Sequence, residues 1–135
     1  MHCMNTIDLS NKVAVVFGVA NHRSIAWSIT NILKGAGATV ALSYQNERLK
    51  RSLDKLTKDW DDPVLVECDV SDDSNVEKAF DEISDKLGKI DIVVHSIAFA
   101  NREDLGGRFV DTSRAGFNLA LEISSYSLIP ITKYA

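Results

Sequence analysis

Four short and nearly continuous apolar segments recur along the chain, at residues 12–17, 39–44, 64–68 and 90–95. An apolar run of this length is typical of a strand that is covered on both faces, as in a parallel sheet. Longer segments with helical spacing separate these runs. We therefore predict four parallel strands that are joined by helical connections.

Three helices are predicted between the strands. The first begins at Ser24, and Gly35 and Gly37 end it; its apolar stripe comprises Ile25, Ile29, Ile32 and Leu33. The second ends at the Asp-Asp-Pro sequence of residues 61–63, and its apolar positions are Leu49, Leu53, Leu56 and Trp60. The third opens at the capping-box pattern of residues 74–77, and its inward positions are Val76, Phe80, Ile83 and Leu87.

A last helix is expected from Thr112 and Ser113 onward, with Ala115, Phe117, Leu121 and Leu128 among its apolar positions. Pro130 lies in the same pattern, where an interior proline would kink the helix at a cost of about 3 kcal/mol. The order βαβαβαβ, then a loop and a long helix, predicts the N-terminal portion of a Rossmann-type, doubly wound α/β sheet. Residues 1–135 then form a single dinucleotide-binding domain that is incomplete at its C-terminus.

Composition narrows the class of protein. The chain has 135 residues, 45% hydrophobic and 25% charged, which is ordinary for a globular protein. A net charge of −4 argues against nucleic acid as a partner. No apolar run is long enough to span a membrane, and residues 1–5 lack a signal-peptide pattern, so we expect a cytoplasmic protein. Cys3 and Cys68 are expected to be free thiols, with no metal site.

The first two strand ends carry candidate cofactor residues. Gly18 permits a sharp turn after the first strand, and Ser24 opens a helix whose N-terminus would attract a pyrophosphate. A glycine turn with a serine cap and no ligand explains the same residues. After the second strand, Gln45 stands where a 2′-phosphate would require Arg or Lys. NADH is therefore favoured over NADPH, although Arg48 lies one helical turn away.

The next two strand ends carry Asp69 and His95. Asp69 could simply cap the following helix, but Ser71 or Ser74 is expected to do so, which would leave Asp69 available for an adenine amino group. His95 has the side chain of a general base, yet a histidine at the end of a buried strand is more often a hydrogen-bonded structural residue. No nucleophile with an orienting acid accompanies it, so a hydrolase is rejected.

Five segments together resemble the bacterial enoyl-acyl-carrier-protein reductases, a divergent branch of the short-chain dehydrogenase/reductase superfamily. They are Gly-Val-Ala-x-x-x-Ser-Ile-Ala at 18–26, Ser-Tyr-Gln-Asn-Glu-Arg-Leu at 43–49, Cys-Asp-Val at 68–70, His-Ser-Ile-Ala-Phe-Ala at 95–100 and Glu-Ile-Ser-Ser-Tyr-Ser at 122–127. The resemblance implies an NADH-dependent oxidoreductase of fatty acid biosynthesis and lipid metabolism. Hydride would pass to the β-carbon of a trans-2-enoyl thioester carried by acyl carrier protein, and the full-length protein would be a homotetramer.

The resemblance also implies a role for each matching residue. The pyrophosphate would lie against Gly18, Ser24 and Ile25, the adenosine side against Gln45, and the adenine against Asp69 and Val70. Ser96 and Ile97 would hold the nicotinamide half. Ala98, Phe99 and Ala100 would border the acyl pocket.

The family's catalytic tyrosine and lysine follow a strand that these 135 residues do not reach. Tyr126 and Lys133 share the Tyr-x6-Lys spacing, but they lie on an earlier helix and are interpreted as a coincidence. We therefore expect an N-terminal half without catalytic residues, which is inactive alone. Another short-chain oxidoreductase that acts on a carbonyl, or a non-catalytic nucleotide-binding fragment, are the alternatives.

Overall fold

The computed structural model describes residues 7–135, so the expectations for Cys3 and for segment 1–5 lie outside the described residues. Its four strands are parallel and form one sheet in the order β3-β2-β1-β4. The main elements are β1 (Val13–Phe17), α1 (Ile25–Gly35), β2 (Thr39–Tyr44), α2 (Glu47–Leu56), β3 (Val64–Glu67), α3 (Asp73–Leu87), β4 (Ile92–His95), α4 (Arg114–Leu121), a π-helical turn η3 (Glu122–Tyr126) and α5 (Leu128–Tyr134). The predicted Rossmann-like sheet is confirmed, and each strand lies within two residues of its predicted bounds.

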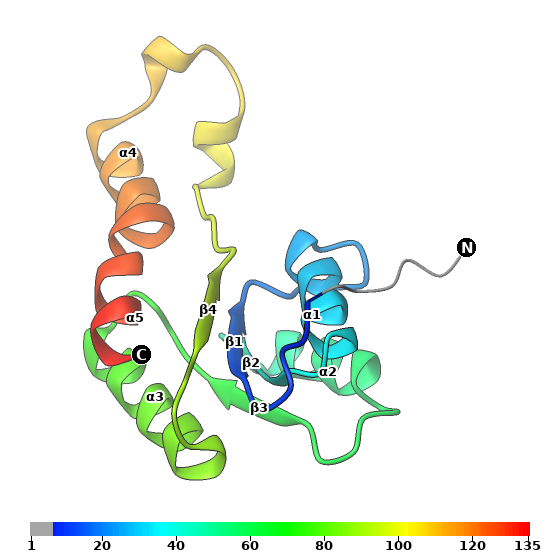
Figure 1. Cartoon of the computed structure of the whole chain (residues 1–135). Helices are drawn as coiled ribbons and strands as arrows, with labels where there is room; N and C mark the ends of the chain where they lie inside the picture. The colour runs from blue at the N-terminus through cyan, green and yellow to red at the C-terminus, as the bar shows by residue number, and fades with distance from the viewer. Residues whose placement is uncertain (1–6) are drawn as a thin grey trace.

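Helices cover both faces of the sheet, as the unbroken apolar runs predict. In Figure 1, α1 and α2 lie on one side of the strands, and α3 and α5 lie on the other. Two core clusters result. The one beneath α1 and α2 includes Ala14, Val16, Leu42 and Leu53, and the one beneath α3 and α5 includes Val15, Phe17, Val66, Phe80 and Ile131. The central strand β1 is therefore buried from Ala14 to Phe17.

The predicted apolar stripe of α1 is only partly confirmed, because Leu33 packs against the core whereas two of its isoleucines do not. Ile25 and Ile32 remain 75% and 65% exposed, whereas Ala26 and Thr30 are fully buried. The Thr30 hydroxyl donates to the Ala26 carbonyl oxygen at 2.8 Å, which satisfies the one polar group on this face. Small side chains let the helix axis approach the sheet closely, so the size of the residues decides the buried face here, not their apolarity.

The second helix is shorter than predicted, because it ends at Leu56 and Thr57 follows as its C-cap. Trp60 lies beyond the helix and stacks on Trp27 of α1, with ring centroids 5.9 Å apart. The Lys34 ammonium lies 4.3 Å from the centroid of the Trp60 ring. Trp60 thus joins the two helices on this face through aromatic and cation–π contacts.

The cap of α3 is also different from the prediction. Asp72 precedes the helix, and its Oδ1 accepts from the Ser74 N–H at 2.9 Å and from the Ser74 hydroxyl at 2.7 Å. These two hydrogen bonds lower the pKa of the Asp72 carboxyl. A carboxylate is a stronger acceptor than a hydroxyl, so Asp72 takes the capping position that Ser71 or Ser74 was expected to fill.

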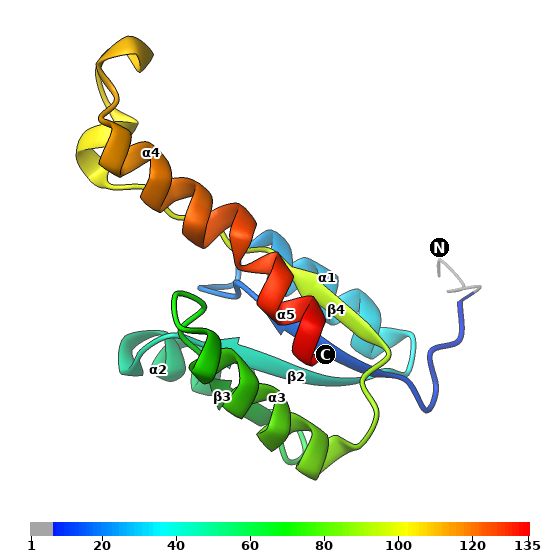
Figure 2. The same ribbon diagram turned by 90° about the vertical axis from the view of Figure 1, so that its left-hand side faces the viewer.

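The last helical segment is not one regular α-helix. The Ser113 hydroxyl caps α4 by accepting from the Gly116 N–H at 2.9 Å, as predicted. At η3 the pattern widens, and the Ser127 N–H bonds the Glu122 carbonyl oxygen five residues earlier. Pro130 then falls in the first turn of α5, where a missing N–H is tolerated. Figure 2 shows that the three pieces still form one continuous rod.

Candidate functional site

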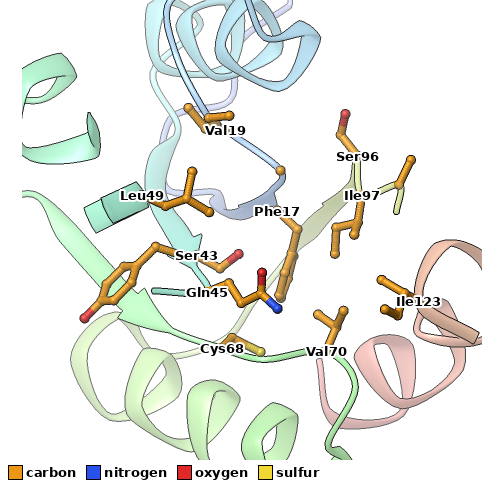
Figure 3. Close-up of a pocket in the computed structure, with 14 residues that line it drawn as sticks. Phe17, Val19, Ser43, Gln45, Leu49, Cys68, Val70, Ser96, Ile97 and Ile123 are labelled. Atoms are coloured by element: carbon orange, nitrogen blue, oxygen red, sulfur yellow. The ribbon is translucent and has the colours of Figure 1, made fainter. Parts of the chain in front are cut away.

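A cavity of about 220 Å³ lies at the carboxyl ends of the strands. Figure 3 shows that all four strand ends contribute to it, together with α2 and the last helical segment. Its lining residues are Phe17, Gly18, Val19, Ala20, Ser43, Tyr44, Gln45, Leu49, Cys68, Val70, Ser96, Ile97, Ala98 and Ile123. This is the place where a doubly wound sheet binds its ligands, because the connections on either side of the first strand diverge there.

The structure brings together some of the predicted site residues and leaves others outside the cavity wall. Gly18, Gln45, Val70, Ser96, Ile97 and Ala98 line it. The remaining candidates do not line it: Ser24, Ile25, Asp69, Phe99 and Ala100. The first two open α1 beside the lining residue Ala20, and the last two continue the chain beyond Ala98.

Sequence reasoning missed several lining residues. Ser43 lies two residues before Gln45 and is buried, and Leu49 follows Gln45 by one helical turn. Both could have been found from their distance to the predicted strand end. Ile123 reaches the cavity from η3, 78 residues further along than Gln45 (123 − 45), and only the fold reveals this contact.

The turn at Gly18 depends on the absence of a side chain. Its φ is +99°, and a Cβ atom built there would lie 2.6 Å from the Ser96 carbonyl carbon and closer still to the Ser96 oxygen. The Ser96 N–H donates to the Phe17 carbonyl oxygen at 3.2 Å, so the two strand ends are bonded as well as packed. Glycine is therefore required here for backbone contact between the ends of β1 and β4.

The loop between β1 and α1 is held by the Ser24 hydroxyl. Its oxygen accepts from the N–H groups of Ala20 and Asn21, each at 3.0 Å, and does not cap the helix as the sequence suggested. Within residues 7–135, the Ser24 hydroxyl itself donates to no acceptor. The N–H groups of Ile25 and Ala26 have no acceptor within residues 7–135. A helix start with unpaired N–H groups and an oriented hydroxyl suits a phosphate.

Asp69 does not have the freedom predicted for it. Its Oδ1 accepts from the Ser71 N–H at 3.0 Å and from the Ser71 hydroxyl at 2.7 Å, which fixes the turn between β3 and α3. The premise that Ser71 or Ser74 caps α3 was wrong, because Asp72 does so and Ser71 is therefore available to bond Asp69 Oδ1. The contact of Asp69 with the adenine stays a prediction. Val70 supplies the cavity wall at this point.

Cys68 forms an uncharged part of the cavity wall. Burial, reinforced by the neighbouring Asp69 charge, raises the pKa of its thiol to about 12. At neutral pH the side chain is therefore a protonated, weakly polar group and a poor nucleophile. It suits contact with a flat apolar ring.

Ser124 of η3 and Ser127, which lies between η3 and α5, hold the end of β4 and the chain that follows it. The Ser127 hydroxyl, fully buried, lies 2.8 Å from His95 Nε2 and donates to the Ile123 carbonyl oxygen at 2.7 Å. The Ser124 hydroxyl accepts from the Phe99 N–H at 3.0 Å and donates to the Phe99 carbonyl oxygen at 3.2 Å. The structural interpretation of His95 is confirmed, since this bond occupies its Nε2.

Tyr126 and Lys133 do not meet at the cavity. The Tyr126 side chain is half exposed, beside Leu121 and Ile129 on the outer face of the helix. Lys133 Nζ lies 3.3 Å from the hydroxyl of Tyr134, not of Tyr126. Neither residue lines the cavity, which agrees with their interpretation as a coincidental spacing.

Within residues 7–135, no three His, Cys, Asp or Glu side chains gather in a way that could hold a metal ion. The described helices are all too short or too polar to cross a bilayer.

Comparisons with known proteins agree with this arrangement. The family model described as Enoyl-(Acyl carrier protein) reductase matches residues 18–135. The enoyl-[acyl-carrier-protein] reductase [NADH] FabI of Enterococcus faecalis is 50% identical over 127 residues, 94% of this chain and 50% of the relative. The corresponding [NADPH] FabI of Staphylococcus aureus is 47% identical over 124 residues, 90% of this chain and 48% of the relative.

Solved structures show the same match. The Bacillus cereus enoyl-acyl carrier protein reductase, solved with NADP+ and an indole naphthyridinone, superposes with a TM-score of 0.90 at 44% identity. The superposition covers 96% of this chain and 51% of the Bacillus cereus chain. The Anaplasma phagocytophilum reductase in complex with NAD superposes with a TM-score of 0.89 at 38% identity. This match covers 96% of this chain and 50% of that one. The chain thus spans about half the length of the relatives it matches.

Proposed function

This chain belongs to the enoyl-(acyl-carrier-protein) reductase family, and we propose that the full-length protein catalyses the NADH-dependent reduction of trans-2-enoyl thioesters. The observation that carries the proposal is the convergence of Gly18, Gln45, Val70 and Ser96 on one cavity at the strand ends. These residues come from four different strand ends, and the family resemblance assigns all of them to one dinucleotide.

The residues present fit such a cofactor. Gly18 lines the cavity and, having no side chain, lets the ends of β1 and β4 meet at its floor. The Ser24 hydroxyl and the N–H group of the exposed Ile25 would receive the pyrophosphate. Val70 and Cys68 would contact the adenine, since both offer uncharged surface beside the turn that Asp69 holds.

We propose NADH as the preferred cofactor, and Gln45 supports this choice. Gln45 is uncharged and lines the cavity at the end of β2, where a 2′-phosphate would need a cation. The relatives include proteins described with NADH and with NADPH, so the preference within the family differs. The side chain at the position of Gln45 is expected to decide the preference between NADH and NADPH.

In the proposed reaction, the bound dinucleotide supplies a hydride for the β-carbon of the enoyl thioester. Ser96 and Ile97 would orient the nicotinamide half, and Ala98, Phe99 and Ala100 would border the acyl chain. The bonds from Ser124 to the Phe99 backbone would hold this border in place. By resemblance, the tyrosine that stabilises the enolate and the lysine that holds the ribose follow Ala135 in the full-length protein.

We also propose that the full-length protein acts in the cytoplasm as a homotetramer on enoyl groups carried by acyl carrier protein. The half-exposed apolar side chains of Phe117, Leu121 and Ile129 on the outer face of the last helical segment support assembly. Light scattering after size exclusion would measure the state directly, and a monomer would contradict this part of the proposal.

The activity is tested by NADH oxidation, followed at 340 nm with a crotonyl thioester. We expect turnover by the full-length protein and none by residues 1–135 alone. Turnover of a ketone or aldehyde instead would indicate another short-chain oxidoreductase. NADH binding without turnover of either substrate would indicate a non-catalytic module, and measurable reduction by the 135-residue chain would contradict its predicted inactivity.

A further inference from the structure

One hydrogen bond ties α2 to the loop that follows β1. The Ser52 hydroxyl donates to the Ala20 carbonyl oxygen at 2.7 Å, across 32 residues of sequence. Leu49 lies one helical turn earlier and lines the cavity, so both side chains project from the same face of α2. The helix that begins beside Gln45 is therefore joined to the loop in front of α1.

The other side-chain hydrogen bonds of this loop are local. Ser24 Oγ accepts from Ala20 and Asn21, and the Asn21 side chain accepts from the Arg23 N–H at 2.8 Å. Among the residues that the structure describes, Ser52 alone connects the loop 19–24 to another element through a side-chain hydrogen bond. The orientation of the loop relative to Gln45 thus depends on Ser52.

The peptide between Ala20 and Asn21 is held at both of its polar ends. Ser52 binds its carbonyl oxygen, and Ser24 Oγ accepts from its N–H. A peptide group is planar, so two bonds on opposite sides fix its orientation. This peptide is in turn bonded to the Ser24 oxygen, so its orientation and the position of that oxygen are coupled.

We infer that Ser52 is a positioning residue for the cofactor, which acts through the Ala20–Asn21 peptide on Ser24. The inference rests on the proposed function, because Ser24 is assigned to the pyrophosphate there. Ser52 does not line the cavity, so it sets affinity for the dinucleotide without touching it. It joins the pyrophosphate loop to the element that carries the adenosine-side residues.

The test compares Ser52→Ala, Ser52→Thr and the control Ser84→Ala in the full-length protein. Ser84 is exposed in the last turn of α3, on the opposite face of the sheet, and its hydroxyl has no hydrogen bond within the described residues. For Ser52→Ala we expect the KM for NADH and its Kd from cofactor fluorescence to rise about three- to ten-fold, as for the loss of one partly exposed hydrogen bond. The kcat and the KM for the enoyl thioester should stay unchanged.

Ser52→Thr keeps the hydroxyl and should restore the wild-type affinity, and Ser84→Ala should have no effect. Alanine is the better helix former, so the melting temperature of Ser52→Ala should not fall. A wild-type KM for NADH in Ser52→Ala, or an equal rise in Ser84→Ala, would overturn the inference. Lack of enoyl reduction by the wild-type protein would instead contradict the proposed function, and NADH titration would still measure the effect of Ser52.

Discussion

Substitution of Gly18 by alanine would separate the two strand ends that form the floor of the cavity. The new methyl group would overlap the Ser96 carbonyl group, which belongs to the backbone and cannot rotate away. The φ of +99° adds a second penalty, because an L-residue avoids this conformation. Both effects act on the same contact between β1 and β4.

The expected loss of stability follows from these two penalties. The backbone conformation costs about 1–2 kcal/mol for a residue with a Cβ. Forcing a methyl group into a filled site costs about 1–3 kcal/mol more. The free energy of unfolding of Gly18→Ala should therefore fall by roughly 2–5 kcal/mol, and affinity for NADH should be lost because Gly18 and Ser96 both line the cavity.

Urea unfolding of the full-length protein, followed by circular dichroism, measures this change. Gly37→Ala is the matched control, since Gly37 has the same φ of +99° and its nearest neighbour is the side-chain oxygen of Ser10 at 2.9 Å. The free energy of unfolding of Gly37→Ala should fall mainly by the penalty of the backbone conformation, about 1–2 kcal/mol. Equal losses in the two variants, or unchanged NADH binding in Gly18→Ala, would refute the steric argument.

Three further predictions concern the cavity and its wall. Gln45→Arg should raise the ratio of kcat/KM for NADPH to that for NADH about ten-fold or more, because a guanidinium would bind the 2′-phosphate; an unchanged ratio would contradict the role of this strand end. The Cys68 thiol keeps its proton up to about pH 12 in the folded protein but ionises near pH 9 when unfolded, so its contribution to the free energy of unfolding is complete below pH 9 and is lost as pH rises toward 12. Urea titrations at pH 8 and 10.5 measure the fall in the free energy of unfolding between the two pH values, and this fall should be smaller in Cys68→Ala than in the wild-type protein. Ser127→Ala should cost about 1–3 kcal/mol by leaving His95 without its partner, whereas Ser125→Ala, an exposed change on the same helix, should cost little.

The sheet could be predicted from the sequence because strands that are covered on both faces must be apolar throughout. The predicted bounds of β2 are those observed, and β4 begins two residues later than predicted. The face of α1 could not be predicted in the same way. Ile25 and Ile32 have the spacing of a buried stripe, but Ala26 and Thr30 are the residues small enough to lie against the sheet.

The candidate site was predictable where its residues directly follow a strand. Gly18, Gln45 and Ser96 do so, Val70 lies three residues beyond β3, and the parallel order brings all four together. The local hydrogen bonding of Asp69 could not be predicted, because its partner depends on which neighbouring residue caps α3.

Contacts between distant segments had no signal in the sequence. The reach of Ile123 into the cavity and the bond from Ser52 to Ala20 depend on how helices pack on the sheet. Such contacts become visible only in three dimensions.

The last helical segment limits how parts of this fold can be exchanged between relatives. Ser124 of this segment bonds Phe99 in the loop that leaves β4, and Ser127 bonds His95, the last residue of β4. The same turn of helix supplies Ile123 to the cavity. A chimaera that imports residues 96–113 alone would therefore pair a foreign loop with native anchoring serines and a native cavity wall. Loop and helix form a single unit of exchange, to be transplanted together with His95 as residues 95–134.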